Sequence, residues 1–131
     1  MASSFTQTWE YPSGEVTTCE LSWTAHTDGS FTTGDLNSSE GLVFMGITIP
    51  DGTTAPTANY DITILDDDGV DIFGGELENR SATLKEQAVP AIGSTFGGRY
   101  FNGVLQLAIS GNVVNGAKGK VKLYILNNIN D

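Results

Sequence analysis

Three consecutive aspartates stand before a glycine in the stretch YDITILDDDGVDIFGG, residues 60–75, and a fourth aspartate follows at Asp71. Carboxylate oxygens are the ligands that Ca²⁺ prefers, so Asp66, Asp68 and Asp71 are candidate metal ligands. Their spacing does not fit an EF-hand loop, because counting from Asp66 places glycine at the fourth position and Leu77 at the twelfth. A calcium site of another kind stays open, since three nearby carboxylates repel one another and attract a cation.

The same residues also fit a tight turn between two strands. If residues 67–69 form a type I turn with Gly69 as a bulge, Asp66 lies opposite Val70 and Ile64 opposite Ile72. This register places the isoleucines on one face, whereas a slip of one residue would set Ile64 against an aspartate. The turn is therefore our favoured interpretation, and a dedicated metal site is the alternative.

Other catalytic chemistry would have to use the single histidine, His26, or the single cysteine, Cys19. Cys19 alternates with Leu21 and Trp23, which is typical of a buried thiol rather than a nucleophile. His26 lies in a polar segment and has no local partners that suggest a triad. We therefore expect no catalytic residues, no bound cofactor and no enzymatic activity. A lone cysteine also excludes an intramolecular disulfide and indicates a reducing compartment.

The charge is unevenly distributed along the 131 residues. Residues 1–79 contain fourteen acidic and no basic side chains, whereas residues 80–131 contain six basic and two acidic ones. The two parts carry −14 and +4, so we expect neither nucleic acid nor anionic membrane as a partner. Either folding mixes the two parts, or an acidic face of one copy meets a basic edge of the next.

Alternating apolar and polar residues predict one all-β domain, residues 1–131, with seven or eight antiparallel strands in a sandwich or barrel. The expected strands and hairpins cover residues 4–11, 16–25, 41–49, 60–75, 104–110 and 118–126. Thr83 and Glu86 have the spacing of a capping box, so residues 81–89 could form a short helical turn. Neither a signal peptide nor a membrane-spanning segment is expected.

The polar segment 26–41 is long enough to be functional, since loops of this length in compact domains usually are functional or disordered. Flat aromatic rings near it could stack on sugars, although core packing is their commoner use. The aromatic candidates are Trp9, Tyr11, Trp23, Phe31, Tyr60, Tyr100 and Phe101. A carbohydrate-binding module is therefore an alternative function, with a polysaccharide lyase or hydrolase as a third that no residues support.

Two stretches resemble a group of small virion structural proteins of tailed bacteriophages. They are NYDITILDDDGVDIFGGELENRSATLKEQAVP, residues 59–90, and FNGVLQLAISGNVVNGAKGKVKLYIL, residues 101–126. The opening SSFTQTWEYPSGEVTT is similar to theirs as well, and the similarity is weak only across residues 26–41. The shared motifs are structural and contain no catalytic residues.

The resemblance implies a particle component made in the cytoplasm of the host bacterium. The capsid decoration, or cement, protein is the principal expectation, and a tail or head-to-tail connector component is the alternative. The resemblance to decoration proteins implies a trimer that braces neighbouring capsid subunits. The implied partners are therefore further copies of the chain and the major capsid protein or a tail protein.

Four basic residues are candidates for contacts within or between subunits. Arg80 is the first basic residue of the chain and could pair bidentately with Glu76 or with the aspartate hairpin, or could simply be solvated. Lys118, Lys120 and Lys122 alternate along the last expected strand and share one face. They either protect an edge strand from aggregation or form a basic strip for an acidic neighbour.

Overall fold

The structure is a computed structural model that describes residues 2–127. All regular elements in this range are strands, so it contains no helix that could cross a bilayer. The strands are β1 (Ser4–Glu10), β2 (Val16–Thr24), β3 (Gly34–Asp35), β4 (Glu40–Pro50), β5 (Asp61–Leu65), β6 (Glu86–Ala88), β7 (Ala91–Ile92), β8 (Thr95–Phe96), β9 (Arg99–Asn102), β10 (Gln106–Ser110) and β11 (Lys118–Leu126). The prediction of a single all-β domain with antiparallel sheets is confirmed.

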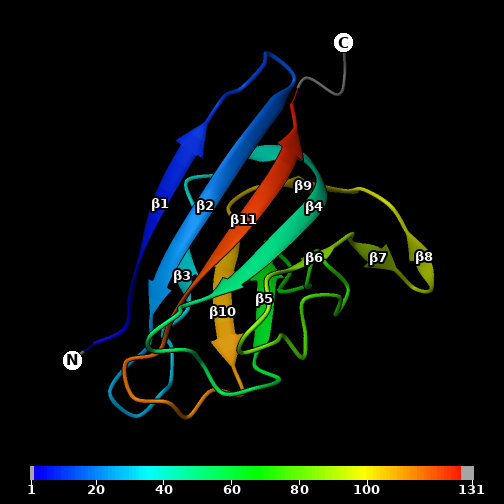
Figure 1. The fold of residues 1–131 in the computed structure, drawn as a ribbon. Coiled ribbons are helices and arrows are strands. Elements are labelled where there is room, and N and C mark those ends of the chain that lie inside the picture. The colour runs from blue at the N-terminus through cyan, green and yellow to red at the C-terminus, as the bar shows by residue number, and fades with distance from the viewer. Residues whose placement is uncertain (1, 128–131) are drawn as a thin grey trace.

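The larger sheet has the order β1-β2-β11-β4-β6, and β9 also pairs with β4 (Figure 1). Every pairing is antiparallel, and β11 lies between β2 and β4 over most of its length. The strands expected at residues 4–11 and 16–25 are present as the antiparallel pair β1 and β2, with Trp9 opposite Cys19. The apolar run at residues 41–49 forms the interior strand β4, as its two apolar faces predict.

A smaller sheet of order β3-β10-β5 packs behind the larger one, so the molecule is a two-layer sandwich (Figure 1). Leu107 of β10 lies opposite Ile64 of β5, and both side chains are buried. From the other sheet, Leu21 of β2 and Leu123 of β11 enter the same core. Alternation thus buries one face of β5, β10 and β11, because successive side chains point to opposite sides of a sheet.

The segment 81–89 contains no helical turn, so that prediction is wrong. Ser81, rather than Thr83, caps the segment: its hydroxyl oxygen accepts the backbone N–H groups of Thr83, at 3.1 Å, and Leu84, at 2.9 Å. The chain then continues as β6, in which Ala88 pairs with Gly46 of β4. Pairing with the large sheet therefore overrides the local capping pattern.

Two segments rich in glycine and polar residues contain short strands. Within residues 26–41, β3 adds two residues to the edge of the smaller sheet. The glycine-rich connection after Pro90 forms the β7–β8 hairpin and then β9. Figure 1 shows the β7–β8 hairpin reaching outward, on the side of the large sheet away from β1.

Candidate functional site

The aspartate run forms the predicted turn. The backbone N–H of Asp66 donates to Val70 O at 2.9 Å, and that of Gly69 donates to Asp66 O at 3.0 Å. Gly69 has φ +77°, the left-handed conformation that a glycine bulge requires. The N–H of Ile72 then donates to Ile64 O at 2.8 Å, which confirms the register expected from the apolar pattern.

The carboxylates of this hairpin accept hydrogen bonds from its own backbone. Asp66 Oδ1 accepts the N–H of Asp68 at 2.9 Å and that of Val70 at 3.0 Å. These bonds, above all the one from Val70, lower the pKa of the Asp66 carboxyl from 3.8. Asp71 Oδ1 accepts the N–H of Phe73 at 3.1 Å, and its Oδ2 accepts that of Gly75 at 2.8 Å.

No group of three or more acidic, histidine or cysteine residues within residues 2–127 has the arrangement of a metal site. Asp66, Asp68 and Asp71 are thus not gathered into one ligand set. The oxygens of Asp66 and Asp71 hold the turns together instead, which gives them a structural role without a cation. The calcium alternative has the sequence as its only support.

The cation beside this hairpin is Arg99, which the sequence analysis did not single out. Its Nη2 lies 2.8 Å from Asp66 Oδ2, and the two side chains are 24 % and 11 % exposed. Arg99 is the first residue of β9 and pairs with Val43 of β4. The ion pair therefore connects the aspartate hairpin to the large sheet. Asp66 and Arg99 are 33 residues apart in the sequence, so no local sequence pattern indicates this contact.

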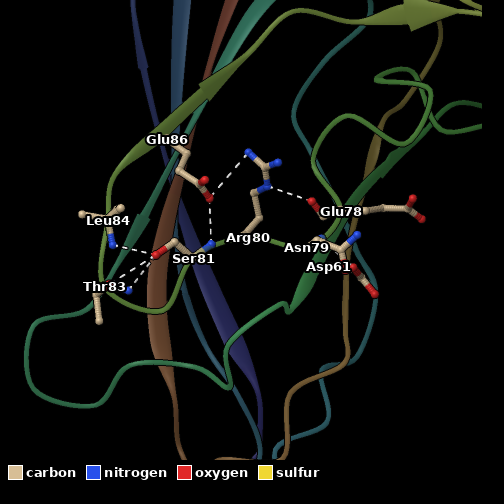
Figure 2. Close-up of polar contacts among 8 residues, drawn as sticks. All are labelled: Asp61, Glu78, Asn79, Arg80, Ser81, Thr83, Leu84 and Glu86. Atoms are coloured by element: carbon tan, nitrogen blue, oxygen red, sulfur yellow. Dashed lines mark hydrogen bonds and ion pairs between the residues drawn. The ribbon is translucent and has the colours of Figure 1, made fainter.

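Arg80 has other partners than those expected for it (Figure 2). Its Nε donates to the carbonyl oxygen of Glu78 at 3.0 Å, and its Nη1 lies 3.8 Å from Glu86 Oε1. The same Glu86 oxygen accepts the N–H of Ser81 at 2.7 Å. The expected bidentate pairing with Glu76 or the aspartate hairpin is therefore wrong, and Arg80 instead connects two parts of its own segment.

The backbone around Arg80 is also tied to β5. Arg80 N–H donates to Tyr60 O at 2.7 Å, and Asn79 N–H donates to Asp61 Oδ1 at 2.9 Å. Asn79 itself has φ +56°, a conformation that asparagine tolerates better than most residues. These contacts fix the start of the segment that leads to β6 and the β7–β8 hairpin.

The three lysines lie on the solvent-facing side of β11, which is an interior strand. The interpretation that they protect a sheet edge is therefore wrong. Lys120 Nζ lies 3.4 Å from Glu20 Oε1 on β2, and Lys122 Nζ lies 5.3 Å from the ring centroid of Tyr124. Two of the lysines thus have partners on their own sheet, and the basic strip remains a prediction.

His26 is held by hydrogen bonds that do not suit a general base. Its Nδ1 accepts the backbone N–H of Ser3 at 2.7 Å, so in the neutral ring the proton is on Nε2. Nε2 lies 2.9 Å from Thr32 Oγ1 and 3.2 Å from Ser3 Oγ, and in this tautomer it donates rather than accepts. Cys19 is fully buried, which raises the pKa of its thiol to about 12.

The aromatic residues do not form one exposed platform. Trp23, Tyr60 and Phe101 are buried in the core, and Phe31 packs edge-on against Trp23 at 6.2 Å between ring centroids. Trp9 and Tyr11 contribute to a small hollow of about 140 Å³ at one end of the sandwich, whereas Tyr100 of β9 is 44 % exposed and is not part of its lining. Polar side chains of residues 37–40 complete its wall.

The most exposed apolar segment surrounds the β7–β8 hairpin. Ile92 is 60 % exposed and Phe96 is 64 % exposed, although both are in paired strands. Leu84 and Val89, which precede the hairpin, are exposed as well. The sequence signal for this feature is the pair of apolar residues Ile92 and Phe96 on either side of Gly93-Ser94-Thr95.

No known protein-family model matches the chain, and no curated protein matches it. Among solved structures, a cupin domain from Bordetella pertussis Tohama I aligns with 95 % of this chain and 96 % of that domain. The two chains are 12 % identical, and the TM-score is 0.33. A TM-score this low carries no inference about function.

Proposed function

We propose that the chain is a non-enzymatic structural protein of a tailed-phage virion, and that it decorates the head by bracing neighbouring capsid subunits. The resemblance of residues 59–90 and 101–126 to such proteins motivates the proposal. On this account the chain acts as a homo-oligomer, a trimer, in contact with the major capsid protein. It is made in the host cytoplasm and carried on the virion.

The observation that best supports an assembly role is the exposed apolar segment that projects from the sandwich. Contiguous exposed apolar patches on a folded chain mark interaction sites more often than chance. Here Ile92 and Phe96 lie on the β7–β8 hairpin, which projects from the sandwich, and the exposed side chains of Leu84 and Val89 lie on either side of β6 before it. A rigid two-layer body with a projecting apolar arm suits a protein whose task is to hold copies together.

Antibody labelling of purified phage particles from cells that produce the chain tests this proposal. We expect label on the head, at regular positions between capsid subunits. Label on the tail or at the head-to-tail junction would replace decoration with the connector alternative. Particles without any label would reject a virion role.

A second function, binding of carbohydrate by the displayed protein, is favoured by the hollow between Trp9, Tyr11 and residues 37–40. Aromatic rings can cover the apolar face of a sugar, while Asn37 and Glu40 offer amide and carboxylate groups for its hydroxyls. The hollow has room for one end of a glycan rather than a long chain. A glycan array probed with the protein and with Glu40→Ala tests it, because binding that is insensitive to this change would reject the site.

A further inference from the structure

We infer that strand β1 of one copy pairs antiparallel with β1 of a second copy, about a two-fold axis at Gln7, so that the two large sheets join into one. The contact is the open edge of the large sheet, Ser4–Glu10. The inference goes beyond the proposed function and does not depend on it, because an isologous contact closes as a dimer. The three-fold contact of the proposed trimer would use a different surface.

Strand β1 has a partner on one side only. It is the last strand of the large sheet at this side, and it pairs with β2. Figure 1 shows β1 at the margin of the molecule, with no strand beyond it. Within residues 2–127, the backbone groups of Ser4–Glu10 have no hydrogen-bond partner outside β2. Such an edge offers a row of free N–H and carbonyl groups to another strand.

The free groups belong to every second residue of β1. The N–H of Ala25, directly after β2, donates to the carbonyl oxygen of Ala117, directly before β11, at 2.8 Å. Successive residues of a strand point their backbone groups to opposite sides, so Thr24 and alternate residues before it point theirs toward β1. The register of the two strands then assigns the outward-pointing groups to Phe5, Gln7 and Trp9.

The other sheet edges within residues 2–127 are short or covered. Strands β3, β7 and β8 have two residues each, β6 has three and β9 has four. Residues 71–80 form bridges and hydrogen bonds along the second side of β5. In contrast, β1 pairs over seven residues without a register shift and contains neither proline nor lysine. Proteins usually protect their edges with short strands, charges or bulges, so the unprotected edge of β1 indicates a partner strand.

The sequence of β1, SFTQTWE, is nearly symmetric about Gln7, and this symmetry selects a second copy as the partner. Two antiparallel copies centred on Gln7 place Phe5 opposite the second copy's Trp9 on one face, and Thr6 opposite its Thr8 on the other. Aromatic pairs and threonine pairs are favourable between neighbouring strands. An axis at Thr6 or Thr8 would shorten the overlap and set Gln7 against an aromatic ring.

The charges are compatible with the same register. Glu10 is the only charged residue of β1, and in the dimer it lies opposite Ser4 of the second copy. The two Glu10 carboxylates are therefore at opposite ends of the contact, whereas like charges directly opposite each other would disfavour pairing. The lysines of β11 lie two strands away from this edge.

The central side chains of the contact are already held in place within each copy. Gln7 Nε2 donates to Asp35 O at 3.1 Å, and Gln7 Oε1 accepts the N–H of Asn37 at 2.7 Å. Trp9 Nε1 also donates to Gln7 Oε1, at 3.1 Å. Groups that are ordered before association lose less conformational entropy when the contact forms.

A proline at the two-fold axis tests the free backbone groups. Gln7→Pro removes an N–H that points away from β2, so the hydrogen bonds between β1 and β2 are retained. Gln7→Ala is the matched control, because it loses the same side-chain bonds and keeps the N–H. Light scattering at the highest soluble concentration should give the wild type and Gln7→Ala twice the mass of Gln7→Pro. A wild type that is monomeric or trimeric, or a mass that Gln7→Pro leaves unchanged, would overturn the inference.

A pair of double variants tests the register, and it keeps the inference testable if the proline variant does not fold. Thr6 and Thr8 are exposed, so substitutions there should be tolerated, and thermal unfolding checks this. Thr6→Glu/Thr8→Lys brings unlike charges together across the axis and should keep the wild-type mass. Thr6→Lys/Thr8→Lys brings only positive charges together and should halve it. Equal masses for the two variants would reject the register.

Disulfide formation provides a third measurement. Cys19 is buried, so Thr6→Cys and Thr8→Cys would each carry one accessible thiol. The two positions form a non-hydrogen-bonded pair, in which the Cα atoms are about 4.5 Å apart, within the range of a disulfide. Oxidised glutathione should therefore join Thr6→Cys to Thr8→Cys in a mixture faster than it joins either variant to itself. Equal rates would contradict the pairing, and virion labelling without this dimer would uphold the proposed function and reject only the contact.

Discussion

The ion pair between Arg99 and Asp66 should make a measurable contribution to stability. A double-mutant cycle with Asp66→Asn and Arg99→Met isolates it, because asparagine keeps an oxygen for the Asp68 and Val70 N–H groups. Methionine in turn keeps most of the aliphatic stem of Arg99. The cycle therefore removes the charges while leaving the turn and much of the packing in place.

The magnitude follows from the burial and geometry of the pair. Fully exposed ion pairs contribute about 0 to 1 kcal/mol, and hydrogen bonds to charged groups contribute about 1.5 to 3 kcal/mol. With 24 % and 11 % of the side chains exposed and an N–O distance of 2.8 Å, this pair falls between the two cases. We expect a coupling energy of about 1 kcal/mol, which corresponds to a shift in Tm of roughly 3 to 5 °C for a domain of this size.

The assay is urea unfolding of the wild type, both single variants and the double variant, followed by tryptophan fluorescence. The control is the same cycle with Arg80→Met in place of Arg99→Met, which should give no coupling with Asp66→Asn because Arg80 pairs with Glu86. A coupling energy under about 0.3 kcal/mol for Asp66 and Arg99, near the limit of additivity for independent sites, would refute the assigned pair. Equal coupling in both cycles would refute its specificity.

Three further predictions concern single side chains. The folded-state pKa of Asp66 lies below 3.8, so the stability that its carboxylate contributes is complete above that pH and is lost as the pH falls through the lowered pKa. Asp66→Asn should therefore reduce the acid sensitivity of Tm, and an unchanged pH profile of Tm would count against this contribution. Arg80→Ala should lower the free energy of unfolding by about 1 kcal/mol through loss of its bonds to Glu78 and Glu86, whereas an unchanged Tm would reject a structural role. Burial raises the pKa of the Cys19 thiol to about 12, so iodoacetamide at pH 8 should modify it only after unfolding; labelling of the native protein at the rate of a free thiol would contradict the burial.

The sandwich could be predicted because its strands alternate strictly and its main turn carries a local signal. Leu21, Ile64 and Leu123 show the period of two that a half-buried strand requires. Gly69 after the aspartates specifies a bulged turn, and the apolar pattern selects the same register. Local sequence and tertiary packing agree at these positions, so each supports the other.

The errors occur where partners are distant in sequence. Thr83 and Glu86 have capping-box spacing, but Glu86 instead reaches Ser81 N–H while Ala88 pairs with Gly46 of β4. The cation for Asp66 is Arg99 rather than Arg80, because the β4–β9 pairing brings Arg99 to the hairpin. The alternating lysines suggest an edge strand, but the position of β11 between β2 and β4 is set by pairing with strands distant in sequence.

The β7–β8 hairpin shows a different limit of sequence reasoning. In the residues AIGSTF, Ala91 is buried, whereas Ile92 and Phe96 remain largely exposed. Alternation alone does not tell whether an apolar side chain faces the inside of its own chain or a partner. The arrangement in space is needed to recognise a candidate assembly contact.

The central claim is that this protein stabilises a phage head, and an add-back experiment tests it most directly. Heads assembled without the chain are heated with and without purified protein, and release of DNA is followed with an intercalating dye. We predict that bare heads open at a lower temperature, and that added protein, but not the Ile92→Ser/Phe96→Ser variant, restores the higher one. Heads that bind no protein, or that open at the same temperature with it, would contradict the account.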